Sequence, residues 1–385
     1  MSYIRHKRKY LTEYINENLI LRESKIAKQS ILRKKKKDIP FSAKIRLTIF
    51  SIIVLCFISP VVTDNIWHGV LLRTFNNQSL DLSVNNSYFN ESEGIFSNDI
   101  LFDTRFLGGV NYKEPEMEAF SIGKEMTGLK SKIQNIVSIY PNSTPGIFVW
   151  DFQTGNYISI NGDKEFSTAS IIKLPILCQL FRRVDNGLVN LNEKIKMTSY
   201  YRTGGSGKLQ FLGDDSEFDI NTLAKVMIQQ SDNTATNMLL STVGGANELN
   251  RNLRNWGFSK TYVKNWLPDL YGENVSTPFD MATILYNIDN PNFLSLKSRA
   301  KIVEIMSHVK NRNLIQKGLP ENAMFIHKTG DIGEMLGDAG IVMMPNGRKY
   351  IIVVMVKRRW NDYSAQNLIV DVSKTVYDAF LTNNY

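Results

Sequence analysis

A serine and a lysine stand three residues apart in Ser170-Ile171-Ile172-Lys173, where an apolar run begins. A serine hydroxyl becomes a nucleophile when a base takes its proton, and a lysine can be that base once burial and nearby cations lower its pKa. Positions i and i+3 of a helix share a face, so the amine can lie beside the hydroxyl. The same pattern occurs at three other places: Ser121/Lys124, Ser298/Lys301 and Ser307/Lys310. The four-residue match alone therefore assigns nothing.

Two polar triplets follow it in the chain, Ser231-Asp232-Asn233 and Lys328-Thr329-Gly330. Taken alone, the first is equally consistent with the N-cap of a following helix, since all three of its residue types are preferred there. In this order and context, the three motifs resemble the three signatures of class A β-lactamases and penicillin-binding proteins. The resemblance covers roughly residues 118–383 and implies a serine hydrolase.

The first motif supplies the groups for acylation. Lys173 could deprotonate Ser170, and the amide of Ser170, at a helix start, could donate to the developing oxyanion. The resemblance implies that the amide of Asp331 is the second oxyanion donor.

The resemblance also gives roles to the other two motifs. Ser231 would relay a proton to the leaving nitrogen, and Asn233 would hold the acyl amide of a ligand and bond Lys173. The substrate carboxylate would be bound by Lys328 and Thr329 on an exposed edge strand that ends in Gly330. Asp232 is expected to fix the turn.

One loop departs from the family pattern. Class A β-lactamases carry a deacylating glutamate in a loop of the form Arg-x-Glu-Pro-Glu-Leu-Asn, and the aligned stretch here is "NWLPDLY", residues 265–271. The glutamate position is Leu267, which cannot activate water. If the acyl-enzyme is hydrolysed, the base could be Lys173, Asp269 or Glu273.

Three functions stay open from these residues. The chain could be a serine hydrolase that forms and slowly hydrolyses acyl-enzymes with β-lactams or related amides. It could be a D-Ala-D-Ala peptidase, acting on a peptidoglycan-like peptide, that β-lactams acylate and block. It could also be a binding or sensing module without turnover, although a binder has no chemical need for the Ser-Lys pair.

The N-terminal region predicts a membrane anchor. Residues 1–46 carry fourteen Lys or Arg and four Asp or Glu, so the net charge of +9 belongs to this tail. Residues 47–63 are seventeen residues without a charge, which is the lower limit for a spanning helix, and the basic flank favours a cytoplasmic N-terminus. A cleaved signal peptide is the competing interpretation. An anchor argues against a nucleic-acid arm and would place the catalytic domain in the periplasm or outside the cell.

The fold class follows from the order of the elements. Residues 64–117 are rich in Asn and Ser and predict a linker, and helical periodicity starts near residue 118. Strands are expected at 146–152 and 157–160, mainly helices over 188–320, then strands at 323–330, 339–345 and 349–358 and a helix at 365–381. We expect an α/β catalytic domain over 118–385, with an antiparallel sheet flanked by helices and an all-helical insertion, as in the serine β-lactamase/transpeptidase-like fold. The two cysteines and four scattered histidines suggest no metal site, and no cofactor is expected.

Overall fold

A computed structural model describes residues 120–383 of the 385-residue chain. The expected tail (1–46), anchor (47–63) and linker (64–117) lie outside the described residues. No helix between residues 120 and 383 is long and apolar enough to cross a bilayer.

A five-stranded antiparallel sheet forms the centre of the domain, in the order β2-β1-β9-β8-β7. Its strands are β1 (Thr144–Asp151), β2 (Tyr157–Ile160), β7 (Met324–Asp331), β8 (Met335–Met343) and β9 (Lys349–Lys357). The middle strand β9 is a continuous apolar run, as expected of a strand buried on both faces. Its side chains alternate between two cores: Ile351 and Val353 join one, and Ile352 and Val354 join the other.

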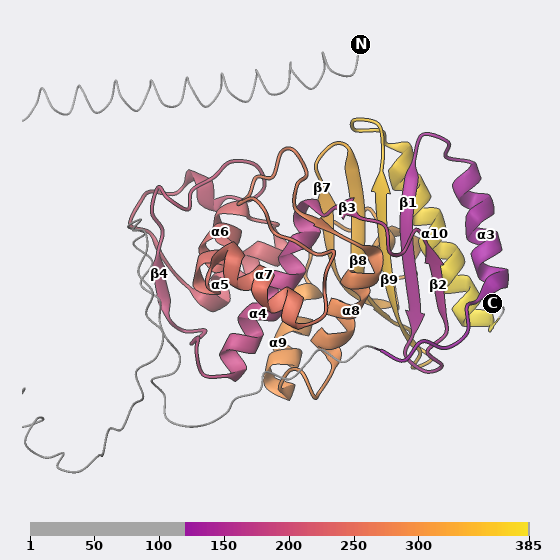
Figure 1. The fold of residues 1–385 in the computed structure, drawn as a ribbon, viewed down its shortest axis with the longest axis horizontal. Helices are drawn as coiled ribbons and strands as arrows, with labels where there is room; N and C mark the ends of the chain where they lie inside the picture. Colours follow the sequence, from indigo (N-terminus) through magenta and orange to yellow (C-terminus); the bar gives the residue numbers. More distant parts are fainter. Residues whose placement is uncertain (1–119, 384–385) are drawn as a thin grey trace, which may run out of the picture. The chain divides into compact units, whose positions relative to one another are not determined.

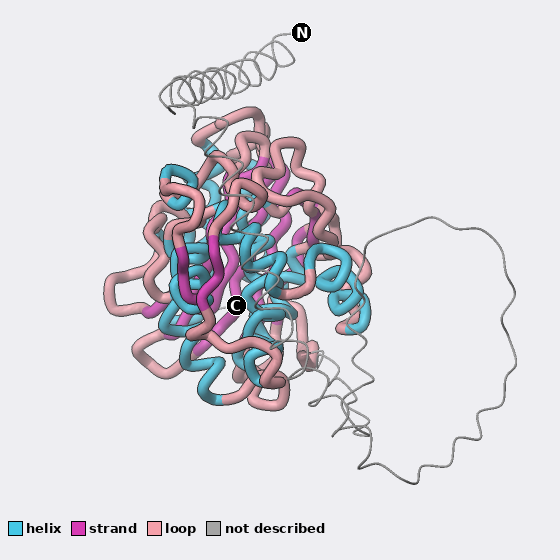
Figure 2. The backbone as a smooth tube through the Cα atoms, turned by 90° about the vertical axis from the view of Figure 1, so that its left-hand side faces the viewer, coloured by secondary structure: helices cyan, strands magenta, loops and turns pink. Residues whose placement is uncertain are grey.

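Helices cover both faces of this sheet (Figures 1 and 2). On one face lie α3 (Thr127–Ser138) and α10 (Ser364–Thr382). On the other lies a helical lobe inserted between β2 and β7, made of α4 (Lys173–Asp185), α5 (Ile220–Gln229), α6 (Asn233–Thr242), α7 (Gly245–Asn255), α8 (Pro278–Asp289) and α9 (Leu296–Met306). The expected antiparallel sheet flanked by helices is therefore confirmed, but the insertion is not all helical, because four short strands lie within it.

Short elements connect these layers. Two small two-stranded sheets pair β3 (Phe166–Ser167) with β6 (Val275–Ser276) and β4 (Lys194–Lys196) with β5 (Glu217–Asp219). Three 3₁₀ turns complete the described chain: η2 (Ala169–Ile172), η3 (Leu209–Phe211) and η4 (Ile315–Gly318).

The first helix begins later than its periodicity predicts. Residues 120–126 are not helical, and Glu125 forms a parallel bridge with Tyr157 of β2. The backbone N–H of Gly123 donates to the carbonyl of Gly155 at 2.8 Å, in the turn between β1 and β2. Tertiary pairing with this hairpin therefore overrides the local helical pattern, and Ser121/Lys124 lies outside any helix.

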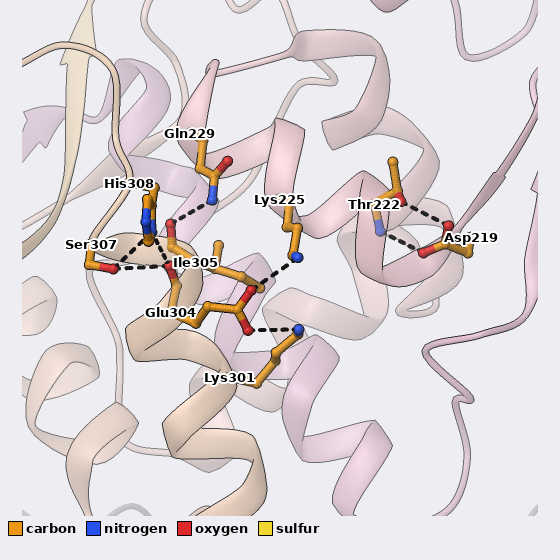
Figure 3. A network of polar contacts seen from close by, with 9 residues as sticks. All are labelled: Asp219, Thr222, Lys225, Gln229, Lys301, Glu304, Ile305, Ser307 and His308. Atoms are coloured by element: carbon orange, nitrogen blue, oxygen red, sulfur yellow. Dashed lines mark hydrogen bonds and ion pairs between the residues drawn. The ribbon is translucent and has the colours of Figure 1, made fainter.

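A surface network of polar side chains joins α5 to α9 in the helical lobe (Figure 3). Asp219 caps α5 by accepting from the backbone N–H of Thr222 at 2.8 Å. Glu304 of α9 pairs with Lys225 at 3.0 Å and with Lys301 at 2.8 Å. The carboxylate of Glu304 thus meets two ammonium groups, as is usual for a solvated helix pair.

Candidate active site

Ser170 lies in a 3₁₀ turn just before α4. Ala169 precedes it with a φ of +45°, a strained value for a residue with a side chain, and such strain is often found at functional sites. Positions i and i+3 are eclipsed in a 3₁₀ turn, which puts Lys173 directly beside Ser170. The Lys173 Nζ lies 2.9 Å from the Ser170 Oγ. This 3₁₀ turn is the segment η2.

The amine of Lys173 contacts four oxygen atoms. Besides the Ser170 Oγ, its Nζ lies 2.7 Å from the backbone carbonyl of Ser231, 3.0 Å from the Ser231 Oγ and 3.0 Å from the Asn233 Oδ1. The carbonyl and the amide oxygen can only accept, so they take two N–H groups of the lysine. A neutral amine then has one lone pair left, and either hydroxyl can donate to it. This arrangement suits a lysine that acts as a base.

The electrostatic surroundings favour that neutral form. Complete burial lowers the pKa of Lys173 well below its usual range, and the positive charge of Lys328 lowers it further, against a smaller opposing effect of Asp232. Burial also lowers the pKa of Lys328 to about 7, with Asp338 opposing. The positive charge of Lys328 therefore adds to burial in disfavouring the protonated form of Lys173.

The second motif is held as a tight turn at the start of α6. Ser231 has a φ of +57°, and Asp232 caps the helix by accepting from the backbone N–H of Ala235 at 2.9 Å. The cap is thus Asp232, and Ser231 and Asn233 are left to face Lys173. The side-chain amide of Asn233 also donates to the carbonyl of Gly204 at 3.1 Å, which orients its oxygen toward the lysine.

The glycines before this turn allow the chain to approach it. A Cβ on Gly207 would lie 2.1 Å from the Asp232 carboxylate, and one on Gly205 would lie 2.7 Å from the side-chain nitrogen of Asn233. Both glycines have positive φ. Only glycine fits at these two positions.

The third motif lies on β7, which is the edge strand of the sheet but is not exposed. Lys328 is 1% exposed and Thr329 is 7% exposed, so the expected exposed edge is wrong. The cause is η2, which packs against β7. A Cβ on Gly330 would lie 2.8 Å from the carbonyl of Thr168, so the contact between η2 and β7 needs a glycine there. The Lys328 Nζ donates to the carbonyl of Thr329 at 2.8 Å.

The register of β7 and β8 directs the amide of Asp331 outward. The N–H of Ile332 donates to the carbonyl of Met335 at 3.1 Å, which makes these two a hydrogen-bonded pair. In an antiparallel ladder the pairs alternate, so Asp331, opposite Leu336, points its N–H away from β8. That side is the edge along which η2 packs. The Asp331 amide is therefore oriented toward the segment that carries Ser170.

The loop over residues 265–274 uses its carboxylates internally. The Asp269 carboxylate is buried and accepts from the side-chain amide of Asn265 and from the backbone N–H groups of Glu273 and Asn274, at 2.7 to 3.1 Å. Glu273 pairs with Lys264 and accepts from the side-chain amide of Asn265. These contacts make Asp269 and Glu273 structural groups of the loop.

Leu267 is tied to α6 by a residue that sequence reasoning missed. The side chain of Asn237 accepts from the backbone N–H of Leu267 at 3.0 Å and donates to its carbonyl at 2.9 Å. Asn237 lies one helical turn after Asn233 on the same face. That spacing was the only available signal for its role. Among residues 120–383, no group of three or more His, Cys, Asp or Glu side chains is placed to hold a metal ion.

Comparison with known proteins places this geometry among enzymes. The Beta-lactamase enzyme family matches residues 128–380. Beta-lactamase VEB-1 of Pseudomonas aeruginosa is 26% identical over 66% of this chain and 90% of its own length, and the extended-spectrum beta-lactamase PER-1 of the same organism is 25% identical over 67% and 89%.

Solved structures agree with that match. PBP-A is 40% identical with a TM-score of 0.67, over 69% of this chain and 100% of its own. A leucine-to-glutamate mutant of PBP-A, solved as its acyl-enzyme complex with penicillin G, is 40% identical with a TM-score of 0.66, over 68% and 99%.

Proposed function

Because the chain belongs to the β-lactamase enzyme family, we propose that it is a serine hydrolase that forms an acyl-enzyme on Ser170 with β-lactams or related amides. One observation carries the proposal above all. The amine of Lys173, fully buried and without a carboxylate among its hydrogen-bond partners, lies 2.9 Å from the Ser170 hydroxyl. A buried lysine in that position is equipped to take the serine proton.

The acylation step then uses Ser170, Lys173 and Ser231. The Ser170 Oγ attacks the carbonyl carbon while its proton moves to the Lys173 Nζ. The resulting oxyanion would be stabilised by the backbone amides of Ser170 and Asp331. As the C–N bond breaks, the Lys173 proton passes through the Ser231 hydroxyl, 3.0 Å away, to the leaving nitrogen.

The remaining motif residues would hold the ligand. Lys328 and Thr329 would bind its carboxylate, and the side-chain amide of Asn233 would hold its acyl amide. Gly330 contributes by having no side chain, which lets η2 and β7 pack closely enough for one ligand to reach both.

Adduct formation tests the proposal directly. Mixing the full-length chain with penicillin G should add the mass of one penicillin, detected by intact-protein mass spectrometry. Ser170→Ala should abolish the adduct, because it removes the hydroxyl that lies 2.9 Å from the Lys173 amine. A wild-type protein that never acquires the mass would contradict the assignment and leave only a binding or sensing role.

Release of the acyl group is expected to be slow. Leu267 occupies the position where the family carries its water-activating glutamate, and the carboxylates of Asp269 and Glu273 are engaged within the loop. We expect Leu267→Glu to accelerate release by at least about tenfold, as a positioned general base does. Leu267→Gln is the matched control and should release as slowly as wild type. Rapid wild-type turnover of a chromogenic cephalosporin would contradict this expectation.

A D-Ala-D-Ala peptidase is the second candidate, favoured by the missing glutamate. Such an enzyme would release D-alanine from a peptide ending in D-Ala-D-Ala, and penicillin would block that release. Following adduct and hydrolysed product together in one sample would separate a peptidase or slow hydrolase from a protein that only binds.

The N-terminal residues support a further part of the proposal. Residues 47–63 would anchor the chain in a membrane with its N-terminus in the cytoplasm and the catalytic domain on the other side. An uncleaved anchor predicts that the full-length chain stays with the membrane fraction after alkaline carbonate washing. Release of a shorter, soluble form would indicate a cleaved signal peptide.

A further inference from the structure

Arg358 clamps the turn that follows the third motif. It stands directly after β9, and its side chain is 3% exposed. Its Nε donates to the carbonyl of Gly333 at 2.8 Å, and its Nη2 lies 2.5 Å from the Asp331 Oδ1. One guanidinium group therefore holds both the backbone and the side chain of the β7–β8 turn.

The backbone around this arginine reinforces the same turn. The N–H of Arg358 donates to the carbonyl of Glu334 at 2.8 Å, and the N–H of Gly333 donates to the Asp331 Oδ1 at 3.0 Å. Gly333 has a φ of +82° and lies under Trp360, so that a Cβ on it would come within 2.9 Å of the indole ring. The turn is thus held by hydrogen bonds to its backbone, by hydrogen bonds to its acidic side chain and by the packing of Trp360.

We propose that Arg358 is a positioning residue for acylation, which acts by orienting the Asp331 amide and by neutralising the Asp331 carboxylate. The inference rests on the function proposed above. The N–H of Asp331 belongs to the peptide plane that comes directly before the clamped turn. Asp331 can therefore supply an oxyanion donor only while the turn keeps this plane in its outward orientation. A misplacement of about 1 Å at such a donor is enough to cost up to about a hundredfold in rate.

The charge of Asp331 gives the pair its second effect. Thr329 and Asp331 are two residues apart on one strand, so their side chains lie on the same face, about 7 Å apart. A ligand carboxylate at Thr329 would therefore meet a second carboxylate nearby. The buried guanidinium cancels most of that repulsion, and the site can accept an anionic ligand despite an acidic residue at its rim.

Two variants and two ligands separate these effects. Arg358→Gln should slow acylation by penicillin G by about 10- to 100-fold, because it loosens the turn and leaves Asp331 unpaired. The methyl ester of penicillin G lacks the carboxylate, so its acylation should slow less. Asp331→Asn leaves Arg358 without its acidic partner and should increase the preference for penicillin G over the ester by about 3- to 10-fold.

Arg348→Gln is the matched control. Arg348 holds the β8–β9 turn at the opposite end of β8 and pairs with buried Asp151 at 3.1 Å. Its loss should lower the melting temperature but leave the acylation rates of the folded protein and the ligand preference unchanged.

The outcomes are distinct. If Arg358→Gln matches wild type with both ligands, or if Asp331→Asn leaves the preference unchanged, the inference is wrong. Should Arg358→Gln fail to fold, the Asp331→Asn preference alone decides it. A wild-type protein that forms no adduct would instead overturn the proposed function.

Discussion

Ser170/Lys173 and Ser298/Lys301 share one four-residue pattern and meet opposite surroundings. In α9, the Ser298 hydroxyl donates to the Asp185 carboxylate at 2.6 Å, and the Lys301 amine lies 2.8 Å from the Glu304 carboxylate (Figure 3 shows Lys301 and Glu304). In the candidate site, the Lys173 amine contacts only hydroxyl, carbonyl and amide oxygens.

The difference shows that spacing brings the two groups together but charge decides what they do. A carboxylate partner favours the ammonium form of a lysine, which cannot accept a proton. Burial and a second cation favour the free amine instead, as they do for Lys173. The candidate pair therefore differs from the surface pair in having no carboxylate among the hydrogen-bond partners of its lysine.

Replacing each lysine in turn should give the largest contrast. We expect Lys173→Met to lower the acylation rate by at least about a thousandfold, because the serine loses its base. Lys301→Met should change that rate by less than about twofold, since it only removes a surface ion pair. Single-turnover acylation by penicillin G measures both. Similar losses of acylation rate in the two variants would contradict the distinction between the two Ser-Lys pairs.

Lys328 should affect folding stability through its lowered pKa. The folded-state pKa of about 7 lies below the unfolded value of about 10.5, so between these values the unfolded chain holds more protons. This lysine therefore destabilises the fold at pH 7, and the penalty fades as pH rises. Lys328→Met should be more stable than wild type near pH 7 by on the order of 3 kcal/mol, with the gap narrowing toward pH 9.5. Thermal melts over that range test it, and a constant gap would contradict it.

The same substitution should shift the pH dependence of any acylation that remains. Removing the Lys328 cation raises the pKa of Lys173, so the amine becomes neutral at higher pH. The ascending limb of the rate profile should move upward in pH. An unmoved limb would mean that another group than Lys173 controls it.

Glu304→Gln should have the smallest effect. The neighbouring ammonium groups of Lys301 and Lys225 lower the pKa of Glu304 to about 2, so its stabilising contribution is complete above its ordinary value of 4.5 and is lost as pH falls toward 2. The group is solvated, so the loss at pH 7 should stay below about 1 kcal/mol. Acylation should be unchanged. Urea unfolding at pH 7 and pH 3 measures the difference, which should shrink at the lower pH.

The sequence predicts that the three motifs come together in one site, because each motif is a short run of residues and their order along the chain matches that of a known family. It predicts Ser170 beside Lys173, and the structure places Ser231 and Asn233 on the same amine. It does not predict the burial of Lys328, because that depends on η2 packing across the sheet edge. It also gives no sign of Arg358, whose partners are 25 and 27 residues away along the chain.

Local pattern fails in a similar way at the start of the domain. Residues 120–126 have helical periodicity, but their backbone forms hydrogen bonds with the hairpin of β1 and β2 instead of a helix. The sequence likewise makes Asp269 a candidate base, yet the hydrogen bonds of its carboxylate hold the loop. Such outcomes depend on contacts between segments distant in sequence, which a short window of residues does not contain.

The pairing of β1 with β9 has a consequence for biosynthesis. Residues 144–151 hydrogen-bond to residues 350–357, so the centre of the sheet cannot close until residue 357 has been made. During translation the β1–β2 hairpin keeps the β1 edge unpaired while the ribosome synthesises the roughly two hundred residues that precede β9. A chain that terminates before β9 would lack the strand on which both layers rest, and we expect nascent or truncated forms to depend on chaperones and to be cleared by proteases.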